Sequence, residues 1–159
     1  AIMGFTAAGI SPTTVTTTKQ CPLGFILTVP DGDNGFVEYM YCYNDSGSTI
    51  SANLAVIRKA ATVQAHIAIA ATGAQVETVL GIAQTEIKNG EYGFVARKGI
   101  VTATCDAAVT ATSSLIVDGS TAGNVTFIAG HASNVVGFGS TLAGRADAGT
   151  LSVYIDCRG

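Results

Sequence analysis

Charged side chains are scarce in this chain. Asp, Glu, Lys and Arg make up 12% of its 159 residues, against about 25% in ordinary soluble domains. The net charge of -3 is spread along the chain, and the only adjacent basic pairs are Arg58-Lys59 and Arg97-Lys98. Nucleic acids are bound by a concentrated basic patch, so we expect no nucleic-acid partner. A free monomer normally carries a more charged surface, which indicates that partners cover part of this one.

Long apolar segments are also missing. No run approaches the roughly 18 residues that a membrane-spanning helix needs, so we expect no membrane partner. The N-terminal residues carry no charge before Lys19 and lack the basic start of a secretory signal. We therefore expect a cytoplasmic product from which the initiator Met has been trimmed.

The cysteine pattern excludes a zinc site, because Cys21, Cys42, Cys105 and Cys157 lie far apart and form no Cys-x-x-Cys pair. An even number would permit disulfides, with three connectivities if all four were paired. Cytoplasmic thiols stay reduced, so we expect the four cysteines to be free and to behave as small buried apolar residues. Disulfides are the alternative.

Catalytic patterns are likewise absent. His66 and His131 are the only side chains that ordinarily titrate near neutrality, and neither is near a nucleophile motif. Residues 119–123 imitate Gly-x-Ser-x-Gly but place Thr at the centre, so we expect a turn. Residues 31–35 depart from a calcium loop, with Cys42 where the bidentate Glu should stand. We expect no enzyme, no cofactor and no metal.

Strand signals fill most of the chain. Val, Ile, Tyr and Thr alternate with polar or small residues, and Gly, Asn, Asp and Pro separate the segments. Residues 52–71 have an Ala-rich composition that also suits a helix, but 62–70 alternate and favour a strand. Many short strands between Gly-rich turns predict an all-β fold, either a small β-barrel or a β-sandwich. Expected strands span residues 24–29, 36–43, 62–70, 76–87, 94–105 (with a bulge or bend at Gly99), 115–117, 125–129, 135–140 and 151–157.

The chain divides into residues 1–20 and a single β domain over 21–159. Residues 1–20 are Thr-rich, with too little apolar surface to fold alone. We expect an extended N-terminal arm that lies on a neighbouring subunit through Phe5 and Ile10; the alternative is an inert tail. In the strand 36–43, three tyrosines share a face that suits either the core or an interface: Tyr39, Tyr41 and Tyr43.

A central motif carries a family resemblance. It runs Val79-Leu80-Gly81-Ile82-Ala83-Gln84, then Asn89-Gly90-Glu91-Tyr92-Gly93-Phe94-Val95, then Gly99. This order resembles that of the capsid decoration (head cement) proteins of tailed bacteriophages. Further similar segments extend the resemblance over about residues 20 to 157: Leu23-Gly24, Glu38-Tyr39-Met40-Tyr41, Gly47-Ser48-Thr49-Ile50, Ala122-Gly123-Asn124-Val125, Val135-Val136-Gly137 and Ala148-Gly149-Thr150-Leu151-Ser152-Val153.

The resemblance implies a structural virion protein on the outer face of a phage capsid. Such a subunit is a β-barrel or β-sandwich, often a trimer, that clamps adjacent major capsid proteins at three-fold positions and has no catalytic residue. The resemblance also makes the loop around Tyr92 a candidate site of contact with the capsid. The alternative is a phage tail or fibre subunit, or a pilin-like appendage subunit. A carbohydrate-binding module would need exposed aromatic platforms, and the chain has no Trp.

Overall fold

The computed structural model describes residues 10–59, 65–106, 108–127 and 137–157. All ten strands in these residues belong to one hydrogen-bonded sheet, so the all-β prediction is confirmed. The strands are β1 (Ile26–Pro30), β2 (Phe36–Asn44), β3 (Ala55–Arg58), β4 (His66–Ile69), β5 (Val79–Ala83), β6 (Tyr92–Cys105), β7 (Leu115–Val117), β8 (Val125–Phe127), β9 (Gly139–Thr141) and β10 (Gly149–Asp156), with two short 3-10 helices, η1 (Gly32–Asn34) and η2 (Val76–Thr78).

The sheet closes on itself through a first ring of strands. Neighbours follow the order β2, β4, β3, β5 and β6, and β6 then pairs with β2. The pairing of β2 with β4 is parallel and covers only Tyr43 opposite His66 and Asn44 opposite Ile67. Side chains from all five strands fill the inside of the ring and form one buried cluster: Met40, Cys42, Ile50, Val56, Ala65, Ile67, Leu80, Ala83, Ile87 and Val95.

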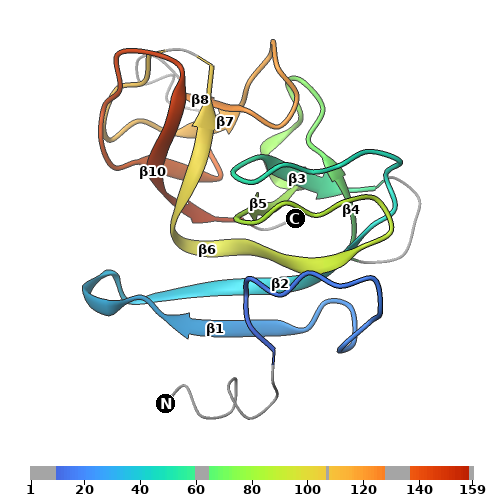
Figure 1. The fold of residues 1–159 in the computed structure, drawn as a ribbon. Helices are drawn as coiled ribbons and strands as arrows, with labels where there is room; N and C mark the ends of the chain where they lie inside the picture. Colours follow the sequence, from blue (N-terminus) through green and yellow to red (C-terminus); the bar gives the residue numbers. More distant parts are fainter. Residues whose placement is uncertain (1–9, 60–64, 107, 128–136, 158–159) are drawn as a thin grey trace.

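A second ring forms on the other half of β6. There β6 pairs with β10, β10 with β9, β7 with β8, and β8 with β6. An isolated bridge between Ser114 and Ser140 joins the β7 side to β9. The apolar cluster here includes Leu115, Val117, Leu151, Val153, Ile155 and both Cys105 and Cys157. In Figure 1, β6 runs below β3, β4 and β5 and then turns upward toward β7, β8 and β10.

β6 serves both rings because it bends at Gly99, as the sequence predicts. Its first half pairs with β2 and β5, and its second half pairs with β10. Gly99 has a φ of +119°, which L side chains rarely adopt. A Cβ there would lie 2.7 Å from the carbonyl oxygen of Phe36. Only glycine therefore fits where β2 crosses the bend.

Several strand predictions are confirmed, and others are corrected. In β10, Leu151, Val153 and Ile155 are buried while the intervening residues are exposed, as the alternation predicts. The expected strand 76–87 is wrong at both ends. Residues 76–78 form η2 because Thr78 Oγ1 donates to the carbonyl oxygen of Gln75 at 2.6 Å, and β5 stops at Ala83.

Other expected strands are shorter in the structure. The segment expected at 62–70 gives β4 over His66–Ile69, because Ala65 has a φ of +67° and breaks the extended backbone. Residues 60–64, 107 and 128–136 lie outside the described part of the chain, and so do the ends of three expected strands. The turn expected over 119–123 is confirmed, since both Ser120 and Thr121 donate their backbone N–H to Asp118 Oδ1.

All four cysteines are free, as expected. Three are buried, and Cys21 is half-buried. Burial raises the pKa of Cys42 and Cys157 to about 12 in each case, against the opposing charge of Arg97. These thiols therefore behave as small apolar core residues. No described helix has the length and hydrophobicity needed to cross a membrane.

Candidate functional site

The candidate tyrosines lie on neighbouring strands. The register of β2 and β6 places Tyr41 opposite Phe94 and Tyr43 opposite Tyr92. The ring centroids of Tyr43 and Tyr92 are 4.5 Å apart, and those of Tyr41 and Phe94 are 5.0 Å apart. Aromatic pairs at these separations stabilise by about 0.5–1.5 kcal/mol beyond their buried area. We call these four residues the aromatic cluster.

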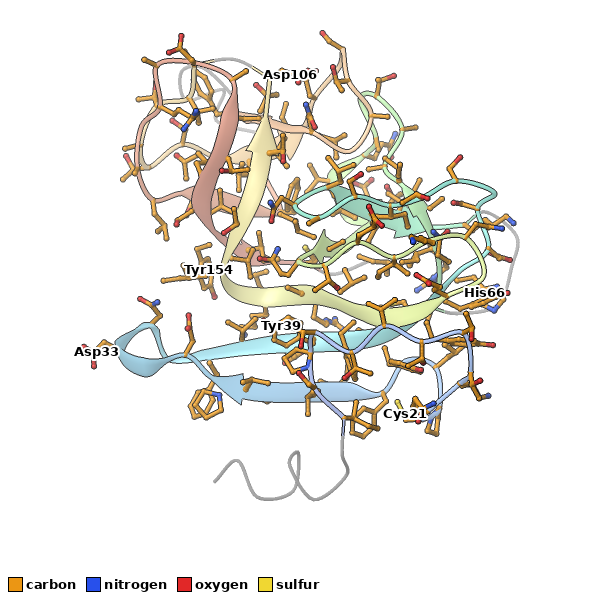
Figure 2. The ribbon with its side chains drawn as sticks, in the orientation of Figure 1. Cys21, Asp33, Tyr39, His66, Asp106 and Tyr154 are labelled. Carbon is orange, nitrogen blue, oxygen red and sulfur yellow. The ribbon has the colours of Figure 1, made fainter. Side chains whose placement is uncertain are left out.

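Burial differs within the cluster. Tyr41 is 1% exposed and Phe94 is fully buried, whereas Tyr43 and Tyr92 are half-buried. Tyr39, two residues before Tyr41, is also half-buried and lies near the hairpin of β1 and β2 in Figure 2. Burial and then the charge of Asp31 raise the pKa of Tyr39, which keeps its phenol protonated at neutral pH. A partner can therefore reach Tyr39, Tyr43 and Tyr92, while Tyr41 serves the interior.

Residues 10–20 are the described part of the expected N-terminal arm, and with the three residues that follow they cover this face of their own chain. We call residues 10–23 the leader. Ile10, Cys21 and Leu23 pack against the buried cluster formed by Leu27, Tyr41 and Phe94. Thr16 and Tyr92 exchange two backbone hydrogen bonds of 3.0 and 2.8 Å. The backbone N–H of Gln20 donates to Tyr41 Oη at 3.0 Å. Ile10 is thus part of an intramolecular contact, and Phe5 lies outside the described residues.

A polar triad adjoins the aromatic cluster where β2 meets β4. The His66 ring lies edge-on to Tyr43, with centroids 5.2 Å apart, and its Nδ1 is 3.0 Å from Asp45 Oδ2. Lys59 Nζ is 3.4 Å from the same oxygen and donates to the Asp45 carbonyl at 2.7 Å. Burial raises the pKa of Asp45, but hydrogen bonds from His66 and Lys59 outweigh it, so the pKa is lowered overall. The triad holds the ends of three strands together, and His66 packs against Tyr43.

A second polar group lies in the other ring and was not anticipated. Asn124 Nδ2 donates to Asp106 Oδ1 in a short hydrogen bond, and the side chain of Asp118 is held by the turn that follows it. A hydrogen bond from Thr121 lowers the pKa of Asp106, burial opposes this, and Asn124 adds to the lowering. The sequence feature that could have indicated this polar group is the turn at Asp118-Gly119. Within the described ranges, no group of three or more His, Cys, Asp or Glu residues could hold a metal ion.

The sequence analysis also did not identify the largest exposed apolar side chains. Three of them lie on or beside β1 and β2: Phe25 is 41% exposed, Ile26 38% and Phe36 63%. Leu142 and Tyr154 are the other two among the described residues. Phe36 and Glu38 share one face of β2, which continues with the buried Met40 and Cys42, so alternation alone did not indicate that Phe36 is exposed.

Neither a protein-family model nor a curated protein sequence matches the chain. Among solved structures, the fold is similar to that of the N base of the head fibre protein gp8.5 of bacteriophage phi29. The TM-score is 0.53 and the sequence identity 11%, over 74% of this chain and 92% of the other. At this identity the likeness concerns the fold.

Proposed function

We propose that the protein is a structural component of a phage virion that binds the outer face of the capsid and stabilises it, as a trimer and without catalytic activity. The observation that carries the proposal is the likeness of its fold to the base of a phage head fibre. A protein with that name is a virion component. Fold alone does not fix function, so a second line of support is needed.

The second line is the motif that resembles head cement proteins. Its Val79–Ala83 segment is β5, a fully buried wall of the first ring. A Cβ on Gly81 would collide with the carbonyl oxygen of Ala96, and one on Gly93 would lie 2.9 Å from Ile87 Cδ1. Gly81 therefore allows close packing between β5 and β6, and Gly93 allows β6 to approach Ile87. The motif resemblance thus concerns residues that build the fold.

The mechanism is mechanical. Each subunit offers modest contacts with the major capsid protein, and a trimer at a three-fold position links several capsid subunits. Linked contacts can raise avidity by about 10² to 10⁴ without any new contact. Low charge density suits surfaces that are buried on the capsid. The load from packaged DNA is then shared between neighbouring capsid subunits.

The test is co-sedimentation of the purified protein with expanded heads that lack it, together with its mass in solution by light scattering. Saturable binding in multiples of three, by a trimer, supports the proposal. Heads that carry the protein should also withstand a higher temperature before they release DNA. No binding to heads, with a monomer or filaments in solution, would refute it.

A second candidate is the base of a fibre or another appendage. The name of the similar structure favours it, since that protein is the base of a head fibre. Such a base would carry a projecting partner. Electron microscopy of assembled virions separates the two candidates, because a fibre base carries a projection whereas a cement protein ends at the capsid surface.

A further inference from the structure

We propose that the open edge of β1 receives an extended strand of the major capsid protein. This inference rests on the proposed function and names the site of contact. Within the described residues, each of the other nine strands has neighbours along both of its edges, through strand pairings or through the bridge of Ser114 with Ser140. β1 alone pairs on one side, with β2. It forms the lower border of the sheet in Figure 1.

The backbone of β1 presents a short row of unpaired groups at this edge. The backbone N–H of Tyr41 donates to the carbonyl oxygen of Phe25, so the backbone carbonyl of Phe25 points toward β2. The hydrogen-bonding direction of successive residues alternates along an antiparallel strand. The backbone N–H and C=O groups of Leu27 and Val29 therefore point toward β2, and those of Ile26 and Thr28 point outward. Pro30 ends the row because it has no N–H. The edge can therefore pair with about one short strand segment.

Three of the four exposed side chains on one face beside this edge are apolar. Cross-strand partners share a face, and Pro30 is the partner of Phe36. Ile26, Thr28, Pro30 and Phe36 therefore lie on one face, and all four are exposed. Proteins normally blunt a free edge with charges or cover it. An added strand with apolar residues at alternate positions would cover Ile26 and continue this face on the side of β1 away from β2, as in other cases of strand addition.

Charge indicates which chain supplies the strand. Between residues 20 and 57 there are four acidic residues and no Lys or Arg. Glu38 has its counter-charge in Arg97, whose Nε is 3.3 Å from Glu38 Oε1. The turn with Asp31 and Asp33 lies at the tip of the hairpin, and Figure 2 shows Asp33 far from the other labelled residues. Because β1 is the one open edge among the described strands, a second copy could offer only its own β1, in a two-fold contact that the proposed trimer does not contain. The fitting partner is therefore a capsid segment with Lys or Arg at the end that meets Asp31 and Asp33.

The experiment compares three exposed-site variants in the head-binding assay. Thr28→Lys places a charge on the open edge, and Ile26→Ser removes the exposed apolar side chain of β1 that the added strand would cover. Ser152→Lys is the matched control, because Ser152 is an exposed hydroxyl residue on β10, which is paired on both sides. We expect Thr28→Lys and Ile26→Ser each to weaken binding about tenfold or more, a change of the size that one interface contact supplies. Ser152→Lys should bind as the wild type does.

Hydrogen exchange on the complex gives a direct readout. The amides of Ile26 and Thr28 should become protected when the protein is bound to heads, because they would donate to the added strand. Wild-type affinity in both edge variants, or unprotected amides, would overturn this inference while leaving the proposed function intact. A lower solution mass for Thr28→Lys would assign the edge to a second copy and also overturn it. If the wild type itself does not bind heads, both proposals fail.

Discussion

At the scale of single residues, Gly99 decides whether the two rings can share β6. We predict that Gly99→Ala lowers the free energy of unfolding by about 2–4 kcal/mol, because a backbone that only glycine tolerates would be strained and the new Cβ would approach Phe36. Gly119→Ala is the control, since nothing lies within 4 Å of a Cβ built there. Urea unfolding of both variants measures the difference. Equal midpoints would show that the bend does not depend on Gly99.

Asp45 provides a pH-dependent contribution to stability. Its pKa is lowered in the fold, so its contribution is present above the unfolded pKa of about 3.9 and is lost as the pH falls through the folded value. We predict that Asp45→Asn costs roughly 0.5–1 kcal/mol at pH 7, the range of partly exposed ion pairs. The difference from the wild type should shrink as the pH falls through the folded pKa of Asp45, because the carboxyl then becomes protonated in both states.

The measurement is the free energy of unfolding of both proteins at several pH values. Asp33→Asn is the matched control, because Asp33 lies exposed in the turn before β2. A difference between wild type and Asp45→Asn that stays constant down to pH 2 would contradict an electrostatic role for Asp45.

At the scale of elements, the leader acts on its own domain over residues 10–23. We predict that Val15→Asp releases it, because Val15 packs against the first-ring cluster and a carboxylate there would be partly desolvated. Lys19 is the only Lys or Arg before Arg58, so trypsin reports release by cutting after Lys19. Cleavage should be at least several-fold faster in Val15→Asp. Thr17→Asp, at an exposed position, should be cut at the wild-type rate; equal rates in all three proteins would mean that the leader is not held by Val15.

Local sequence pattern predicts elements well where one face meets the core and the other meets solvent. β10 is such a case, and its alternation was read correctly. β2 is not, because Met40 and Cys42 face the inside of the first ring while Tyr41 lies under the leader. Both faces are therefore buried at the centre of this strand. That arrangement depends on ring closure between segments far apart in sequence, which periodicity within one strand does not contain.

The candidate site was foreseen only in part for the same reason. Tyr41, Tyr43 and Tyr92 were singled out one strand at a time, and the structure brings them into one cluster. Their pairing is set by the register of β2 and β6, which residues 36–43 alone do not specify. The open edge of β1 is a property of the whole topology, since it is defined by the strands that do not pair with it. Individual residues such as Ile26 therefore gave no signal.

At the scale of the whole molecule, the shared strand β6 couples the two rings. Cys42 is buried in the first ring cluster, and Cys105 and Cys157 are buried in the cluster of the second ring. Because β6 forms part of both rings, breaking one removes a wall of the other. We therefore predict a single cooperative unfolding transition, as for most domains of this size, with all three thiols exposed at the same denaturant concentration.

Pulsed thiol labelling across a urea series, read by mass spectrometry for each cysteine, measures this coupling. Cys21 is half-buried and serves as the internal reference for a site that reacts before global unfolding. Full denaturation should give four reactive thiols, because none is in a disulfide. If Cys105 and Cys157 became reactive at a lower urea concentration than Cys42, the second ring would open alone. The chain would then consist of two folding units joined by β6, since the closed first ring could survive without its neighbour.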